Sequence, residues 1–387
     1  MATAGKRRER GEGAIYQDQR SKRWCCALDL GVVDGKRKRK IVSAATKKEV
    51  VEKLKTLQAE QQHGGVITTK SDSLSIFLEK WLSEKVALNT KPRTVESYRA
   101  MIRLHIVPGL GKTKLEALTP QHVDSLLTRK RAEGLSARTV QYLRGILRAA
   151  LNTAIKWGLV SKNVAALADA PTGEKYEPHP LTPDQAQAFL QAAEGDRCAA
   201  LYRLALSVGL RQGELLGLRW ADIDLDAGSL RVEQTVQVVA GRLVFGTPKT
   251  KTSKRTLPLT PALIATLRLH HARQLAERLK AGGRWKDHDL VFCTTIGTPQ
   301  SPRNVVRDFK ALLANAGLPG VIRFHDLRHS CASYLAAHGV APKVAMELLG
   351  HASIVTTMNI YTHAFTADKV AAGVALDAMF TGGKRAG

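Results

Sequence analysis

The chain has 387 residues, enough for two or three domains of ordinary size, and carries 59 Lys and Arg against 34 Asp and Glu, a formal net charge of +25. So large a positive excess repels itself unless a polyanion compensates it, which makes nucleic acid the first candidate partner. A membrane surface is a poor candidate because the sequence offers no basic amphipathic helix, lipidation signal or apolar run of about 18 residues, and we expect the protein to act in the cytosol.

Residues 1–65 are predicted to form a small domain of three strands and one helix. Short strand-like pieces at 14–16, 24–30 and 40–43 alternate with turn residues, and a helical pattern of apolar residues follows. Residues 1–70 hold 17 Lys and Arg against 8 Asp and Glu, a net charge of +9 in under a fifth of the chain. This density favours a DNA contact over an ordinary solvated charged face.

Residues 72–168 are predicted to form an all-helical domain. Cap signals and apolar spacing indicate helices that begin or run at Leu74, Pro92–His105, Thr119-Pro120 and Ser136–Ile155. The second of these is expected to close at Pro108. We expect the apolar stripes to form a core and the exposed basic side chains to position a DNA backbone: Arg93, Arg99, Arg103, Arg129, Lys130, Arg131, Arg138 and Arg144.

The stretch 169–180 combines proline, glycine and charge without periodicity, which is typical of a linker. Beyond it, residues 181–387 are predicted to form the largest domain. Thr182-Pro183 caps its first helix, a glycine break at Gly209 separates the next two helices, and strands separated by turns fill 229–258. Helices are expected from there to near the C-terminus.

Four short motifs in this last domain carry the candidate chemistry. Gly209 ends a helix just before Arg211, and Glu214 follows three residues later. His325 and Arg328 lie three positions apart within His325-Asp326-Leu327-Arg328-His329, so an imidazole and a guanidinium can converge on one anion. The remaining two motifs are Leu349-Gly350-His351 and, ten residues after it, Tyr361.

These motifs, in this order, closely resemble those of the tyrosine recombinase family, and among its members the integrases of actinobacterial-type phages and integrative elements. The resemblance covers about 74–365. It implies an α+β, mainly helical catalytic domain, a helical core-binding domain over 72–168 and an arm-type DNA-binding domain over 1–65. It also implies the catalytic set Arg211, Lys249, His325, Arg328, His351 and Tyr361.

The lysine of this set has two candidates. The family places it on a β-hairpin, and the matching stretch runs from Thr247 to Pro258. Lys249 fits best because it directly follows Thr247-Pro248 at a strand end, where proline restricts the backbone. Lys251 remains an alternative, since three lysines crowd this turn.

The chemistry of DNA strand transfer accounts for these residue types. Its transition state concentrates negative charge on the non-bridging oxygens of the phosphate. The guanidinium groups of Arg211 and Arg328 are always charged and can each donate two parallel hydrogen bonds to such oxygens. Tyr361 supplies the nucleophilic oxygen, and His325 is the candidate base that accepts its proton. Lys249 protonates the leaving 5′ oxygen, and His351 donates a hydrogen bond to a non-bridging oxygen. A 3′-phosphotyrosyl linkage conserves the energy of the broken bond, so we expect neither a metal nor a nucleotide cofactor. Glu214, Asp326 and His329 are expected to orient the others.

The expected partners follow from the resemblance. They are double-stranded DNA attachment sites and three further copies of the chain, which together synapse two sites as a homotetramer. The resemblance also allows for an excisionase and a host DNA-bending protein. An apolar C-terminal tail, with Val370, Val374 and Phe380, is expected to dock on a neighbouring copy or on its own domain.

Three other classes of protein compete with the tyrosine recombinase hypothesis. A type IB topoisomerase shares the chemistry but acts as a monomer, and a DNA-binding regulator would lack the full residue set. A zinc hydrolase would use His325 and His329 as ligands, but Asp326 stands where the zinc motif has glutamate, and Arg328 repels a cation. The five cysteines contain no CxxC pair and are expected to be buried, reduced thiols.

Overall fold

The structure is a computed structural model that describes residues 15–33, 36–62, 72–169, 171–173, 176–248 and 253–364. The chain divides into two compact units, Met1–Lys175 and Tyr176–Gly387. The predicted C-terminal tail falls in 365–387, and Lys249 and Lys251 fall in 249–252, so all of these lie outside the described residues.

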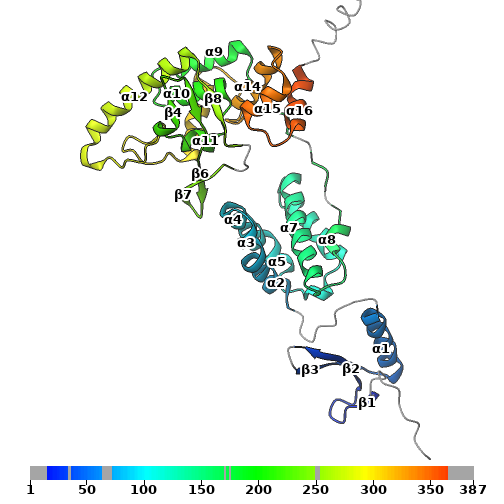
Figure 1. Ribbon diagram of the computed structural model, residues 1–387. Coiled ribbons are helices and arrows are strands. Elements are labelled where there is room, and N and C mark those ends of the chain that lie inside the picture. The colour runs from blue at the N-terminus through cyan, green and yellow to red at the C-terminus, as the bar shows by residue number, and fades with distance from the viewer. Residues whose placement is uncertain are drawn as a thin grey trace, which may run out of the picture. The chain divides into compact units, whose positions relative to one another are not determined.

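The first part of the chain forms a three-stranded sheet followed by a helix (Figure 1). Strands β1 (Ile15–Gln17), β2 (Trp24–Val33) and β3 (Lys36–Ala44) are antiparallel in that order, and α1 (Lys47–Gln62) follows. Cys26 and Leu28 of β2 pack with Val50 and Leu54 of α1. This confirms the predicted sheet and helix, except that β3 begins earlier, because pairing with β2 draws its basic run into the sheet.

Helices occupy residues 74–167. Two of them contain a wider π turn: α2 (Leu74–Trp81) continues through Leu82–Val86 into α3 (Ala87–Asn89), and α4 (Pro92–Met101) continues through Ile102–Ile106 into α5 (Val107–Leu110). A short 3₁₀ turn follows (Leu115–Ala117), and then α6 (Pro120–Ala132), α7 (Ala137–Lys156) and α8 (Val164–Leu167). The predicted closure at Pro108 is wrong, because the π turn that precedes this proline lets the helix continue past it.

The apolar stripes of these helices form one core, as predicted. Phe77 and Leu78 are fully buried, and the indole nitrogen of Trp81 donates to the Thr153 hydroxyl at 3.1 Å across the core. The expectation that Lys130 is exposed is wrong. Its side chain is buried and its ammonium group donates to Glu133 at 2.6 Å, so it is not available to a DNA backbone.

The second unit opens with α9 (Pro183–Ala192), α10 (Ala199–Val208) and α11 (Gln212–Gly217), the last followed by a 3₁₀ turn (Trp220–Asp222). Its strands form the antiparallel sheet β4 (Ile223–Asp224), β5 (Ser229–Arg231), β8 (Thr256–Pro258), and a separate hairpin of β6 (Thr235–Val239) and β7 (Arg242–Gly246). The remaining helices are α12 (Pro261–Ala281), a 3₁₀ turn (Gly282–Arg284), α13 (Pro302–Asn315), α14 (Asp326–Ala337), α15 (Pro342–Leu349) and α16 (Ile354–Ala364).

One large apolar core joins these elements. The ring of Phe189 on α9 meets Tyr202 of α10 and Phe309 of α13 edge to face, each with centroids 5.3 Å apart, and the latter two rings are tilted to each other at 6.2 Å. The predicted cap is present, since the Thr182 hydroxyl accepts the Gln185 amide and the Gln185 side chain accepts the Thr182 amide. Figure 1 shows α14, α15 and α16 packed together at the end of this unit away from α12.

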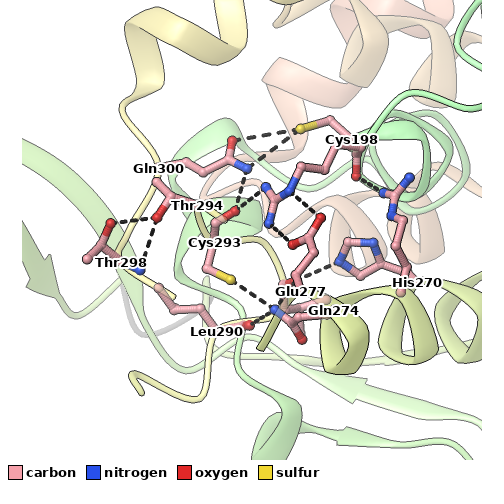
Figure 2. Close-up of polar contacts among 12 residues, drawn as sticks. Cys198, His270, Gln274, Glu277, Leu290, Cys293, Thr294, Thr298 and Gln300 are labelled. Carbon is pink, nitrogen blue, oxygen red and sulfur yellow. Dashed lines mark hydrogen bonds and ion pairs between the residues drawn. The ribbon is translucent and has the colours of Figure 1, made fainter. Parts of the chain in front are cut away.

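A polar network ties the start of α10 to α12 and to the segment 290–300 (Figure 2). Arg197 forms a forked pair with Glu277, at 2.7 and 2.5 Å, and also donates to the Cys293 carbonyl. Gln300 donates to that same carbonyl at 2.8 Å. The thiols of Cys198 and Cys293 lie inside this network, and burial raises the pKa of both. All five cysteines are buried free thiols, as predicted.

Candidate active site

Two glycines in the left-handed conformation end the helices that border the site. Gly209 (φ +68°) ends α10, and Gly350 (φ +65°) ends α15. Both turns are also crowded, because a Cβ at Gly209 would lie 2.6 Å from a Leu349 methyl and a Cβ at Gly350 would lie 2.8 Å from an Arg255 nitrogen. Glycine at these positions therefore permits both the sharp turn and the close approach of neighbouring side chains.

Arg211 lies immediately before α11, in extended conformation, with its side chain 35% exposed. Nη1 donates to Glu214 Oε1 at 2.7 Å, and Nη2 donates to the Gly350 carbonyl at 2.9 Å. The other carboxylate oxygen of Glu214 accepts the Arg211 backbone amide at 3.1 Å. Glu214 therefore holds both the backbone amide and the guanidinium of Arg211, while part of the guanidinium faces solvent.

Arg328 projects from the first turn of α14 and is 4% exposed. Nη1 donates to the Gly209 carbonyl at 2.6 Å and Nη2 to the Leu349 carbonyl at 2.5 Å. Burial, with the positive charge of Arg211 nearby, lowers the pKa of Arg328 to about 9. The group therefore stays protonated at neutral pH and adds a second fixed positive charge beside Arg211.

Two imidazoles lie within electrostatic reach of these arginines. Partial desolvation, then His329 and Arg328, lower the pKa of His325 to about 4. Burial, then Arg328 and Arg211, lower that of His351 to about 4. Both rings are therefore neutral near pH 7, so each has one nitrogen able to accept a proton. The His325 and His329 rings meet edge to face at 5.1 Å.

Tyr361 occupies a different setting on α16. Its side chain is 1% exposed and packs with Ala336 and Ala345. Its hydroxyl donates to the Val340 carbonyl at 2.7 Å, and burial raises the pKa of the phenol. The structure thus groups Arg211, Arg328, His325 and His351. The Tyr361 hydroxyl instead donates a hydrogen bond to a backbone carbonyl between α14 and α15.

Residues 179–368 match the sequence profile of the phage integrase family, and residues 73–130 match the SAM-like N-terminal domain of phage integrases. An integrase of Streptomyces ambofaciens is 34% identical over 386 residues, covering 98% of this chain and 99% of that protein. The chain belongs to the phage integrase family. A XerC-like tyrosine recombinase of Caldanaerobacter subterraneus is 32% identical over 366 residues, covering 90% of this chain and 93% of that protein. This integrase is therefore a tyrosine-type site-specific DNA recombinase.

Solved structures confirm the predicted fold class. The Tn1549 transposon integrase, solved with transposon right end DNA, superposes with a TM-score of 0.67 at 24% identity, covering 78% of this chain and 98% of that one. A lambda integrase dimer bound to a COC' core site superposes with a TM-score of 0.57 at 22% identity, covering 92% of this chain and 96% of that one. Among the helices that the structure describes, none is long and apolar enough to cross a membrane.

Three side chains beside these groups are not predicted from the sequence. Thr357 is fully buried on α16, and its hydroxyl lies 2.9 Å from His351 Nδ1. Arg255 contacts Glu214 and the end of α15. The Tyr176 hydroxyl donates to Asp326 Oδ2 at 2.6 Å. Each lies far along the chain from its partner or in a run of similar residues, so no local pattern could mark it.

A second hydrogen bond joins Asp326 to the residues that precede α14. The carboxylate is fully buried and also accepts the Arg323 backbone amide at 2.8 Å. The Arg323 guanidinium lies 3.6 Å from the centre of the Tyr176 ring. Burial, then the bond to Asp326, raise the pKa of Tyr176 to about 12, so the phenol remains a hydrogen-bond donor at the start of the helix that carries Arg328.

Proposed function

We propose that Arg211 and Arg328 bind the non-bridging oxygens of the scissile phosphate. The observation that carries this proposal is the convergence of both guanidiniums on the carbonyls of Leu349 and Gly350, the two residues that precede His351. Because these contacts hold the two charges in place before DNA arrives, little reorganisation is required when negative charge builds up on the phosphate.

Tyr361 is the proposed nucleophile and His325 the proposed base. The phenol oxygen attacks phosphorus as its proton passes to the neutral His325 imidazole, and the bond from phosphorus to the 5′ oxygen breaks. Since a phenol has one proton to donate, Tyr361 must release the Val340 carbonyl before this step. The neutral state of His325 supports its role, because a protonated ring could not accept.

The departing 5′ oxygen takes its proton from Lys249 in this proposal, with Lys251 as the alternative. His351 donates to a non-bridging oxygen through Nε2. That requires the proton to sit on Nε2, and the Thr357 hydroxyl at Nδ1 favours this tautomer when it acts as donor. Rejoining reverses these steps, with the 5′ hydroxyl attacking the 3′-phosphotyrosyl bond, so no nucleotide is consumed.

The domains divide the DNA contacts. Residues 72–168 and 181–387 would bind the core of an attachment site, joined by the linker 169–180, while residues 1–65 would bind separate arm sequences of long attachment sites, in the cytosol of a bacterial host. A homotetramer would synapse two sites, as supported by a lambda integrase tetramer solved on a Holliday junction. An excisionase and a host DNA-bending protein remain part of this proposal as accessory partners, and the C-terminal tail as a docking segment.

Covalent trapping tests the proposed residue roles. Sequencing of junctions formed in cells defines the core site, and a nicked version of that site loses the 5′ end needed for rejoining, so a phosphotyrosyl adduct accumulates. We expect Arg211→Ala and Arg328→Ala each to slow adduct formation by about a hundredfold, the usual effect of removing one fixed oxyanion donor. Adduct formation at the wild-type rate in both variants would contradict the assignment of the phosphate clamp.

A further inference from the structure

Arg255 forms the third arm of a set of arginines around the end of α15. Its Nε donates to the Leu348 carbonyl at 2.8 Å, Arg328 donates to the Leu349 carbonyl, and Arg211 donates to the Gly350 carbonyl. Three successive carbonyls at the negative end of a helix thus each receive a different guanidinium. Arg255 directly precedes β8, Arg328 lies on α14, and Arg211 lies in the loop between α10 and α11.

The other nitrogens of Arg255 reach two further parts of the site. Nη2 donates to Glu214 Oε2 at 3.1 Å, and Nη1 donates to the Ser253 carbonyl at 3.0 Å. Ser253 is the first described residue after 249–252, where both candidate lysines lie. Each of the three guanidinium nitrogens of Arg255 thus donates to a protein oxygen, and the side chain is 7% exposed, against 35% for Arg211.

Glu214 is shared between two arginines. One oxygen accepts from Arg211 and the other from Arg255, and the carboxylate is 2% exposed. Without Arg255, Arg211 would be the only arginine that pairs with this buried carboxylate. Arg211 would then have to break its bond to Glu214 in order to bind a phosphate. With Arg255 present, three positive charges surround one negative charge, so the site retains a positive excess for an anion.

We propose that Arg255 is a positioning residue of the recombination reaction, which sets Arg211 through Glu214 and His351 through the end of α15. This inference rests on the proposed function of Arg211 and His351. Arg255 touches neither DNA nor the nucleophile in this assignment. It acts by dividing the charge of Glu214 and by fixing the backbone turn from which His351 projects.

The test compares Arg255→Met with a matched control, Arg219→Met. Arg219, like Arg255, pairs with a buried carboxylate: it donates to Asp222 through two bonds, at 2.7 and 2.9 Å, in the same unit but outside the set of arginines. Single-turnover adduct formation is measured with the full chain on the nicked core site at saturating DNA. We expect Arg255→Met to be at least about tenfold slower than Arg219→Met, because small displacements of a phosphate-binding group reduce rates steeply.

A pH profile provides a readout that general destabilisation would not move. The charge of Arg255 helps to keep the pKa of Glu214 low, and it also contributes to the lowered pKa of His351. Removing Arg255 raises both pKa values. The acid side of the cleavage profile should therefore shift to higher pH in Arg255→Met and stay in place in Arg219→Met. Arg255→Lys, which keeps the charge without the fork, should fall between wild type and Arg255→Met in rate.

The outcomes separate this inference from the proposed function. An Arg255→Met rate within twofold of the control, with an unshifted acid limb, overturns the positioning role. Arg211→Lys is run in the same series, and if that variant cleaves like wild type, the phosphate clamp itself has been wrongly assigned. Should Arg255→Met fail to fold by circular dichroism, Arg255→Lys against Arg219→Lys supplies the same comparison, with the same two outcomes.

Discussion

Removing the Tyr361 hydroxyl is expected to do two separable things. Tyr361→Phe eliminates the nucleophile, so no adduct should form. It also removes the buried bond to the Val340 carbonyl, which holds the side chain in the free protein. A hydroxyl–carbonyl bond contributes about 0.5–1.5 kcal/mol net, and the free chain should lose about that much unfolding free energy. For a domain of this size, 1 kcal/mol corresponds to roughly 2–4 °C in melting temperature.

The same bond must be broken before cleavage, so its loss should help the DNA-bound state. If attack requires Tyr361 to leave Val340, the phenylalanine variant no longer opposes that release. Its affinity for the core site should then be unchanged or tighter, by up to roughly fivefold for 1 kcal/mol. Affinity is measured by fluorescence anisotropy on the intact core duplex, where rejoining keeps the adduct from accumulating.

Tyr334→Phe is the matched control for this measurement. The Tyr334 hydroxyl also donates to a backbone carbonyl, that of Leu181 at 2.8 Å, but it has no place in the proposed chemistry. Tyr334→Phe should lose similar stability without any gain in DNA affinity. Weaker binding of Tyr361→Phe than of wild type would refute the reasoning, because it would mean that DNA binding depends on the bond to Val340.

The remaining predictions concern pH, the general acid and the N-terminal domain. His325 and His351 each have a pKa near 4 in place of the ordinary 6.5. The rate of single-turnover cleavage should therefore be constant from neutral pH down to about 5 and fall as the pH approaches 4. An acid limb centred at 6.5 would argue against neutral rings in this site. Because both pKa values are lowered by folding, the unfolded chain binds more protons between pH 6.5 and 4, and the urea-derived unfolding free energy should decrease as the pH falls through that window. Lys249→Ala should cleave slowly and recover when sulfur replaces the 5′ leaving oxygen, whereas Lys251→Ala should mainly weaken binding; rescue of Lys251→Ala alone would exchange the two roles. Deleting residues 1–65 should leave core-site cleavage measurable while reducing recombination of long attachment sites, and equal recombination of long and short sites would remove the arm-binding role.

Much of the fold is predictable because its signals are local. The Thr182-Pro183 start of α9 and the glycine end of α10 depend on backbone geometry within a few residues, and both occur where the sequence indicates. Apolar spacing likewise located the helices of 74–167, since a helix must bury one face whatever it packs against. The prediction that the helix ends at Pro108 is wrong because a π turn earlier in the same helix accommodates the proline, and no residue pattern predicts that turn.

The sequence by itself determined the family, the order of the motifs and the types of residue that strand transfer requires. Only the tertiary structure decided how those residues are held. The bond from Tyr361 to Val340 joins α16 to the loop between α14 and α15, and Arg255 reaches Leu348 across 93 positions of the chain. Such contacts depend on which backbone carbonyls three separate elements expose to one another. A carbonyl is common to every residue, so the sequence carries no mark of the one that an arginine or a tyrosine will bind.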